Sequence, residues 1–149
     1  MPNMTELLKQ LLVPNISEKN LKELLSFSKE LTYEAGTIIY REDEESSQLL
    51  IVEDGQVDVQ YMMATGRRET LDTCHHGDIL VWSAVVAPYS TNSIGVARSK
   101  TNLVAIDGPK LRALCEKDME FGYHLMSHVA VVIRRRLQAA RREIVSLRD

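Results

Sequence analysis

The chain has 149 residues, of which 44% are hydrophobic and 26% charged, and its net charge is −3. This size and composition predict one soluble globular domain, and no apolar run approaches the roughly 18–20 residues that a membrane span needs. Its two cysteines are too few for a disulfide framework or for an iron–sulfur cluster, which takes about four. The N-terminus lacks the basic start and apolar stretch of a signal peptide, so we expect a cytoplasmic protein.

Two short helical patterns open the chain. The segment TELLKQLLV is followed by Pro14, and Ser17 is placed to cap a second helix over SEKNLKELLSFS. From residue 29 to residue 107 the pattern changes to short β-branched segments separated by turn signals: LTYEAGTIIYRE, QLLIVEDGQVDVQYMMA, ETLDTC, SIGVAR and TNLVAID. Strands that recur about every ten residues predict an antiparallel sandwich or barrel rather than βαβ units.

Residues 108–149 return to the helical period. A short helix over PKLRALCEK is followed by a long one in which apolar residues recur at alternating gaps of four and three, an unbroken heptad seam. The residues of this seam are Met119, Tyr123, Met126, Ala130, Ile133, Leu137, Ala140, Ile144 and Leu147.

A second apolar stripe on the same helix consists of Leu125, Val129 and Val132 and stops near three consecutive arginines. Because two stripes cannot face one partner, we expect the first half of the helix to pack on the β body. The seam then meets a second copy in a parallel homodimer. The alternative is a helix that merely lies along its own domain.

The flanks of the seam are basic. From residue 117 onward there are seven basic and four acidic residues, so this segment carries +3 and residues 1–116 carry −6. In a parallel pair Arg136 and Arg141 would face each other, which is a like-charge clash. We therefore expect these arginines to point to solvent or to meet something acidic, such as the body of the partner or another macromolecule.

These elements together resemble the cyclic-nucleotide-binding domain of the catabolite activator and Fnr superfamily. The family pattern of a turn glycine and then an apolar strand ending x-x-G-x-V-x-V matches Gly36, Leu49 to Val52, Gly55, Val57 and Val59. The resemblance covers nearly the whole chain. It implies a single domain over 1–149, mainly β: N-terminal helices (1–28), an antiparallel jelly-roll or β-roll (29–107), and C-terminal helices (108–149) that end in a dimerisation helix.

The phosphate-binding cassette of that family, Gly-Glu-apolar followed by Arg-Ser/Thr-Ala, falls on Gly77-Asp78-Ile79 and on Thr91-Asn92-Ser93. In the family the carboxylate holds a ribose hydroxyl and the arginine pairs with the phosphate. Asp78 keeps the carboxylate here. The arginine position falls on Thr91, or on a neighbour in 90–93 if the insertion is placed differently, and none of these residues is basic. Losing a desolvated charge partner costs on the order of several kcal/mol, which disfavours cyclic AMP bound in the family's manner.

The loop over residues 75–97, HHGDILVWSAVVAPYSTNSIGVA, contains no lysine or arginine, yet it retains groups that bind ligands. Hydroxyl and amide side chains offer neutral donors and acceptors, and the two aromatic rings could stack on a flat ligand or belong to the core. The candidate ligand-binding residues are Gly77, Asp78, Ile79, Trp82, Ser83, Tyr89, Ser90, Thr91, Asn92 and Ser93. The candidate ligand is a cyclic nucleotide or another small anion.

Metal, haem and catalytic chemistry are disfavoured. The run Cys74-His75-His76 and the pair His124/His128 contain metal-ligating side chains, but the two helical histidines fall at outer heptad positions. In the carbon-monoxide-sensing relatives that the family includes, the haem ligands fall on positions that are Val81 and Ser83 here. We find no nucleophile motif, metal-hydrolase motif or phosphate loop, and we assign no catalytic residue and no metal ligand.

The sequence therefore predicts a non-catalytic regulatory or sensory homodimer whose ligand is altered or absent. Direct operator reading is not expected, because the chain ends at Asp149, without a helix-turn-helix after the long helix. Two alternatives remain: a ligandless dimeric scaffold that recruits a protein partner, or weak cyclic AMP or cyclic GMP binding through Asp78 and backbone groups.

Overall fold

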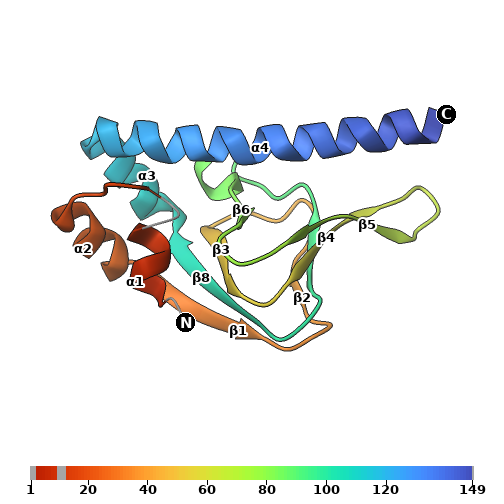
Figure 1. The fold of residues 1–149 in the computed structure, drawn as a ribbon, viewed down its shortest axis with the longest axis horizontal. Coiled ribbons are helices and arrows are strands. Elements are labelled where there is room, and N and C mark those ends of the chain that lie inside the picture. The colour runs from red at the N-terminus through yellow and green to blue at the C-terminus, as the bar shows by residue number, and fades with distance from the viewer. Residues whose placement is uncertain (1–2, 10–12, 149) are drawn as a thin grey trace.

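The computed structural model describes residues 3–9 and 13–148 and places eight antiparallel strands in two sheets, with helices before and after them (Figure 1). The helical elements are α1 (Met4–Leu7), α2 (Glu18–Ser26), the 3-10 turn η2 (Ser83–Val85), α3 (Gly108–Lys117) and α4 (Met119–Arg148). The strands are β1 (Ser28–Tyr33), β2 (Ile38–Tyr40), β3 (Gln48–Asp54), β4 (Val57–Met62), β5 (Arg68–Cys74), β6 (Ile79–Val81), β7 (Ile94–Ala97) and β8 (Thr101–Asp107). This architecture confirms the predicted fold class.

The predicted elements and the observed ones agree at the N-cap of α2 and differ at one strand. Ser17 caps α2 as expected, because its hydroxyl accepts from the backbone N–H of Asn20 at 3.1 Å. Part of the first predicted helix, residues 10–12, lies outside the described residues. Residues 79–81, expected in the ligand loop, form the short strand β6, which pairs with β3 and is buried.

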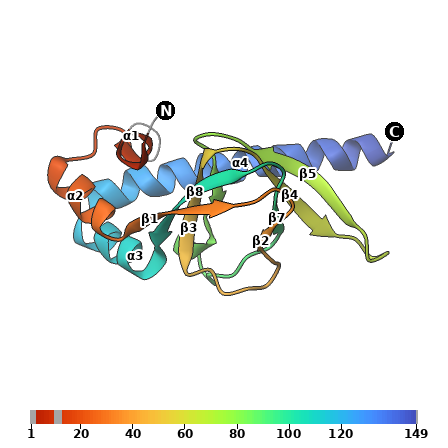
Figure 2. The ribbon, with the colours of Figure 1, turned by 90° about the horizontal axis from the view of Figure 1, so that it is seen from below.

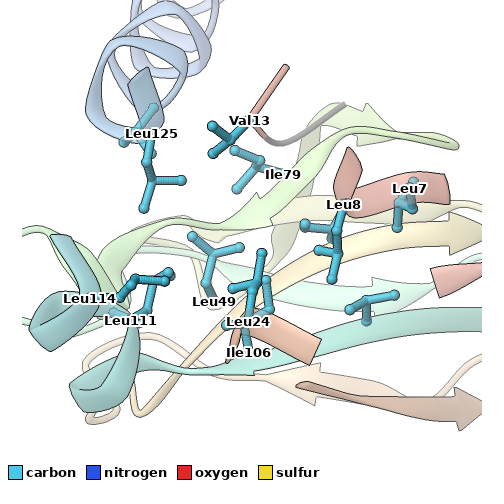
Figure 3. Packing of buried hydrophobic residues seen from close by; sticks show 14 of the residues in the cluster. Leu7, Leu8, Val13, Leu24, Leu49, Ile79, Ile106, Leu111, Leu114 and Leu125 are labelled. Atoms are coloured by element: carbon cyan, nitrogen blue, oxygen red, sulfur yellow. The ribbon is translucent and has the colours of Figure 1, made fainter. Parts of the chain in front are cut away.

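The two sheets have the strand orders β1-β8-β3-β6 and β2-β7-β4-β5. Strand β3 is buried on both faces, which explains why its apolar run is continuous rather than alternating. Leu50 and Val52 belong to a cluster between the sheets, whereas Leu49 and Ile51 belong to a cluster with the helices. Figure 3 shows that helix-side cluster, in which Leu49 lies among leucines of α2, α3 and α4.

Helix α4 lies along one side of the roll, with α1, α2 and α3 near its beginning and the β4–β5 hairpin beside its second half (Figures 1 and 2). The inner stripe anchors it: Leu125 and Val129 are fully buried in the helix-side cluster. This confirms that the first half of α4 packs on the body. No helix in the described part of the chain is long and apolar enough to cross a membrane.

Most of the heptad seam faces away from the body. Ile133 is half-buried and contacts the core, but the large residues around it are exposed. These exposed residues are Met119, Tyr123, Met126, Leu137, Ile144 and Leu147, at 37% to 79% exposure. The structure holds one copy of the chain, so the homodimer remains a prediction.

Candidate functional site

The candidate site is a cavity of about 310 Å³ beside α4, formed largely by the segment between β6 and β7. We call it the loop cavity. Its lining combines apolar side chains with neutral hydroxyl and amide groups, most of them from the predicted ligand loop. The lining residues are Tyr40, Asp43, Leu80, Val81, Trp82, Ser83, Val86, Ala87, Pro88, Ser90, Thr91, Asn92, Ser93 and Arg136. A cavity of this size lies at the lower end of the range for small-molecule sites.

Tyr40 forms one wall of the loop cavity. Its hydroxyl lies 2.9 Å from the Ser93 hydroxyl, and burial raises the pKa of Tyr40 to about 12. The ring lies directly over Gly95, where an added Cβ would come within 2.1 Å of Tyr40 Cε1. Gly95 in β7 therefore allows the Tyr40 ring to occupy this position, because any larger residue would clash with it.

Thr91, one of the residues in 90–93 predicted to occupy the arginine position of the cassette, is held by the loop that precedes β3. Its hydroxyl accepts from the N–H of Glu44 at 3.0 Å and donates to the carbonyl oxygen of Arg41. Two backbone hydrogen bonds, from Asp43 N–H to Thr91 O and from Thr91 N–H to Glu44 O, close the contact at 2.9 Å each. Thr91 is buried. Because its hydroxyl already makes hydrogen bonds to the backbone of the loop before β3, it is not free to bind a ligand.

The cation of the loop cavity comes from α4. The Nη2 group of Arg136 donates to the carbonyl oxygens of Ile79 and Leu80, both at 3.0 Å. The guanidinium carbon lies 4.2 Å from the centroid of the Trp82 ring, a cation–π contact, and the side chain is only 12% exposed. Arg136 is thus a site residue that the sequence analysis missed.

We expected Arg136 and Arg141 to point to solvent or to meet something acidic. Arg141 is exposed, whereas Arg136 does not point to solvent but packs on the body of its own chain. Its acidic neighbour is Asp72 of its own chain, whose carboxylate oxygen lies 3.9 Å from Nε. The spacing did indicate that Arg136 faces the body, because Arg136 follows Val132 by four residues and so continues the inner stripe of α4. An arginine was not expected on that face because charged groups are costly to bury without partners. Here two backbone carbonyls and an aromatic ring supply the partners.

The structure brings six of the ten predicted ligand residues into the loop cavity and leaves four outside it. Those in the lining are Trp82, Ser83, Ser90, Thr91, Asn92 and Ser93. Gly77, Asp78, Ile79 and Tyr89 are not in the lining. The Asp78 carboxylate closes its own turn by accepting from the N–H of His75 at 2.8 Å, and the Tyr89 ring lies 4.1 Å from the guanidinium carbon of Arg112. Asp78 therefore does not lie where it could bind a ligand in the loop cavity.

The candidate metal ligands do not gather. Within residues 3–9 and 13–148, no group of three or more His, Cys, Asp or Glu side chains could hold a metal ion. Cys74 is buried with its sulfur 3.4 Å from Arg136 Nη2, while His76 is exposed and its ring nitrogen lies 2.7 Å from the carbonyl oxygen of Glu53. The haem positions Val81 and Ser83 both lie in the loop cavity, where neither supplies an imidazole or a thiolate.

Cys74 should make stability fall at high pH. Burial raises the pKa of its thiol from 9.0 to about 11, so above pH 9 the unfolded chain loses this proton while the folded chain retains it. The protonated Cys74 thiol therefore contributes fully to the free energy of unfolding below pH 9, and this contribution is lost as the pH rises toward 11. Between pH 8 and pH 10.5 the free energy of unfolding should fall by about 2 kcal/mol more in the wild type than in Cys74→Ser. Urea titrations at both pH values measure this, and equal losses would contradict it.

A profile of the family described as cyclic nucleotide-binding domain matches residues 30–118, which is more than half of the chain. The chain belongs to the cyclic nucleotide-binding domain family. The matched span includes the loop that forms the cavity but ends before α4, so Arg136 lies outside it.

Several solved structures are similar to this chain. A Geobacter metallireducens GS-15 protein described as cyclic nucleotide-binding is 26% identical, with a TM-score of 0.73 over 83% of this chain and 89% of that chain. A cyclic nucleotide-binding domain from Methylobacillus flagellatus KT is 15% identical, with a TM-score of 0.79 over 96% of this chain and 81% of that one. The catabolite activator protein of Thermus thermophilus is 20% identical, with a TM-score of 0.70 over 89% of this chain and 61% of that protein. Among curated proteins, no sequence matches this chain.

Proposed function

We propose that this protein is a non-catalytic regulatory module in which a small ligand in the loop cavity shifts α4, the helix through which two copies pair. The observation that carries the proposal is the position of Arg136. This residue belongs to α4, yet it lines the cavity and bonds to the carbonyl oxygens of β6. A ligand that binds one arrangement of Arg136 more tightly than another must shift the equilibrium of α4 as well.

The altered cassette is part of this proposal. Thr91 stands where the family arginine is expected, and its hydroxyl is engaged by the neighbouring loop. The carboxylate of Asp78 is likewise engaged in its own turn. Cyclic nucleotide binding through the usual carboxylate and arginine is therefore disfavoured, and the ligand is held in a different manner. Membership in a family that includes the cyclic nucleotide-binding domain of Methylobacillus flagellatus supports a ligand-responsive role.

Pairing through α4 is supported by the exposed seam. Six large apolar side chains lie along one face of the helix between Met119 and Leu147, a length of about 40 Å at 1.5 Å per residue. Monomeric proteins rarely leave so long an apolar stripe in water. Val131 and Val145 are also exposed but lie off the seam, so they do not extend it.

The ligand-binding half of the proposal predicts a thermal shift. A ligand at a hundred times its dissociation constant stabilises the folded state by about 2.7 kcal/mol, which for a chain of this length raises the melting temperature by roughly 5–10 °C. A screen of cyclic nucleotides, nucleotides and small organic anions by thermal melting tests this. The control is Asn92→Trp, which places a large ring at an exposed position of the cavity lining and should abolish the shift. No shift with any compound would favour the ligandless scaffold.

A further inference from the structure

The loop cavity contains two formal charges among its lining residues, the guanidinium of Arg136 and the carboxylate of Asp43. The remaining side chains of the lining are neutral. Asp43 lies on the loop before β3, in a left-handed backbone conformation with φ of 58°. Its N–H is bonded to Thr91, and its carboxylate makes no hydrogen bond or ion pair with the residues that the structure describes.

The Arg136 guanidinium is only partly satisfied. Its Nη2 group donates to two carbonyl oxygens, but Nη1 makes no hydrogen bond with the described residues. The side chain as a whole is 12% exposed and lines the loop cavity, so a ligand in the cavity can approach the guanidinium. An arginine has five N–H donors in a planar fork that matches a phosphate or a carboxylate. Three of them, one on Nε and two on Nη1, make no hydrogen bond with the described residues.

The charge of Arg136 is also incompletely neutralised. Carbonyl oxygens accept hydrogen bonds but carry no net charge, and the nearest carboxylate, Asp72, lies beyond hydrogen-bond distance at 3.9 Å from Nε. Asp72 is itself 43% exposed, so water screens its effect. A cation that is 12% exposed, next to a cavity and short of a full counter-charge, favours an anion in that cavity.

We propose that Arg136 is the anion-binding residue of the loop cavity. The ligand carries a phosphate or carboxylate group for Arg136 and an amine or ring N–H donor for Asp43. This inference rests on the proposed function and specifies its ligand class. It also moves the positive charge of the site from the loop, where Thr91 stands, to α4. An anion bound to Arg136 then acts directly on the helix that carries the seam.

The chain offers its own reporter for the test. Trp82 is the only tryptophan in the sequence, and its ring contacts the Arg136 guanidinium, so its emission reports on this cavity. Three probes separate the parts of the ligand: 3′,5′-cyclic AMP carries both the anion and the amine, adenosine lacks the anion, and inorganic phosphate lacks the ring. Each is titrated against the full chain by Trp82 emission and by calorimetry, which does not depend on the ring.

Arg136→Gln removes the proposed anion partner, and Arg135→Gln is its matched control. Arg135 carries the same charge on the same helix turn but is exposed and is not part of the loop cavity. We expect Arg136→Gln to weaken cyclic AMP and phosphate binding by about 10–100-fold, the effect of losing a hydrogen bond to a charged group. Arg135→Gln should change either affinity by less than about twofold, the range of surface charge effects.

Two further variants keep the test decisive if Arg136→Gln folds poorly. Arg136→Lys retains the charge but not the planar fork, and should weaken binding by an intermediate factor. Asp43→Asn lies on a surface loop and should weaken cyclic AMP binding while leaving phosphate binding unchanged or tighter, because it removes a negative charge from the cavity.

The outcomes separate this inference from the function on which it rests. Cyclic AMP affinity that is the same in Arg136→Gln as in the wild type would overturn the role of Arg136 and leave the ligand-binding module intact. Adenosine binding that drops as much as cyclic AMP binding in that variant would also overturn it. Failure of all three probes to bind the wild type would overturn the ligand class inferred here, whereas the proposed function is overturned only if the broad thermal-shift screen also finds no ligand.

Discussion

Replacing Ile144 by lysine is expected to convert the protein from a dimer to a monomer. Ile144 lies on the heptad seam, near the C-terminal end of α4, and is 54% exposed. Two lysines brought together across a parallel seam would repel each other and lose the apolar contact. Because Ile144 is outside both core clusters, the fold of each protomer should remain unchanged. Light scattering over a range of concentrations measures the change in mass.

Val145→Lys is the matched control for this change. Val145 is adjacent in sequence, equally apolar and 59% exposed, but it occupies an outer position of the heptad. It should therefore leave the dimer intact. If both variants remain dimeric, the seam is not the interface; if the wild type is a monomer at high concentration, pairing through α4 is wrong. The thermal-shift screen stays informative in either case, since the loop cavity lies within one chain.

Replacing Gly55 by alanine is expected to lower the free energy of unfolding by about 3 kcal/mol, the sum of backbone strain and overpacking. Gly55 forms the turn between β3 and β4 with φ of 94°, which disfavours any side chain. An added Cβ would also lie 2.5 Å from the carbonyl oxygen of Lys100 and 2.8 Å from the Cα of Thr101. Both are backbone atoms, so the β7–β8 turn must move. Urea denaturation measures the loss.

Gly66→Ala separates these two costs. Gly66 has a similar φ of 85° in the turn between β4 and β5, but nothing lies within 4 Å of an added Cβ there. This variant should show the backbone strain alone, about 1 kcal/mol. Equal losses in the two variants would mean that the close approach of the β7–β8 turn contributes nothing.

The local rules of sequence reading succeeded where one residue and its near neighbours decide the outcome. Ser17 caps α2, as predicted from the sequence. In β4, Val57 and Val59 are buried and alternate with partly exposed residues, as the period of two predicts. The same rules missed β6, because its three apolar residues are too few to show a period and only pairing with β3 makes them a strand.

The candidate site was predictable only in part. Most of the loop over residues 82–93 lines the cavity, as predicted. These residues are neighbours in the sequence, so they lie close together in any fold that places them in one loop. Asp78 was assigned from its place beside a turn glycine, but its carboxylate bonds to His75 within that turn. Arg136 is 45 residues beyond Thr91 in the sequence, and no local pattern connects the two. Whether a charged residue on a helix lies in solvent or in a cavity depends on what the other elements offer it.

The sequence by itself determined the order of the helices and of every strand except β6, and the two faces of α4, because these follow from periodicity, capping and turn residues that act over a few positions. The family was indicated by the resemblance of the segment from Gly36 to Val59. Only the tertiary structure decided which charge belongs to the loop cavity. Packing Leu125 and Val129 into the core sets the rotation of α4. That rotation carries Arg136 against β6, where two carbonyl oxygens and the Trp82 ring hold it. The positive charge that the loop lacks is thus provided by a helix, because burial of the inner stripe leaves Arg136 facing the body.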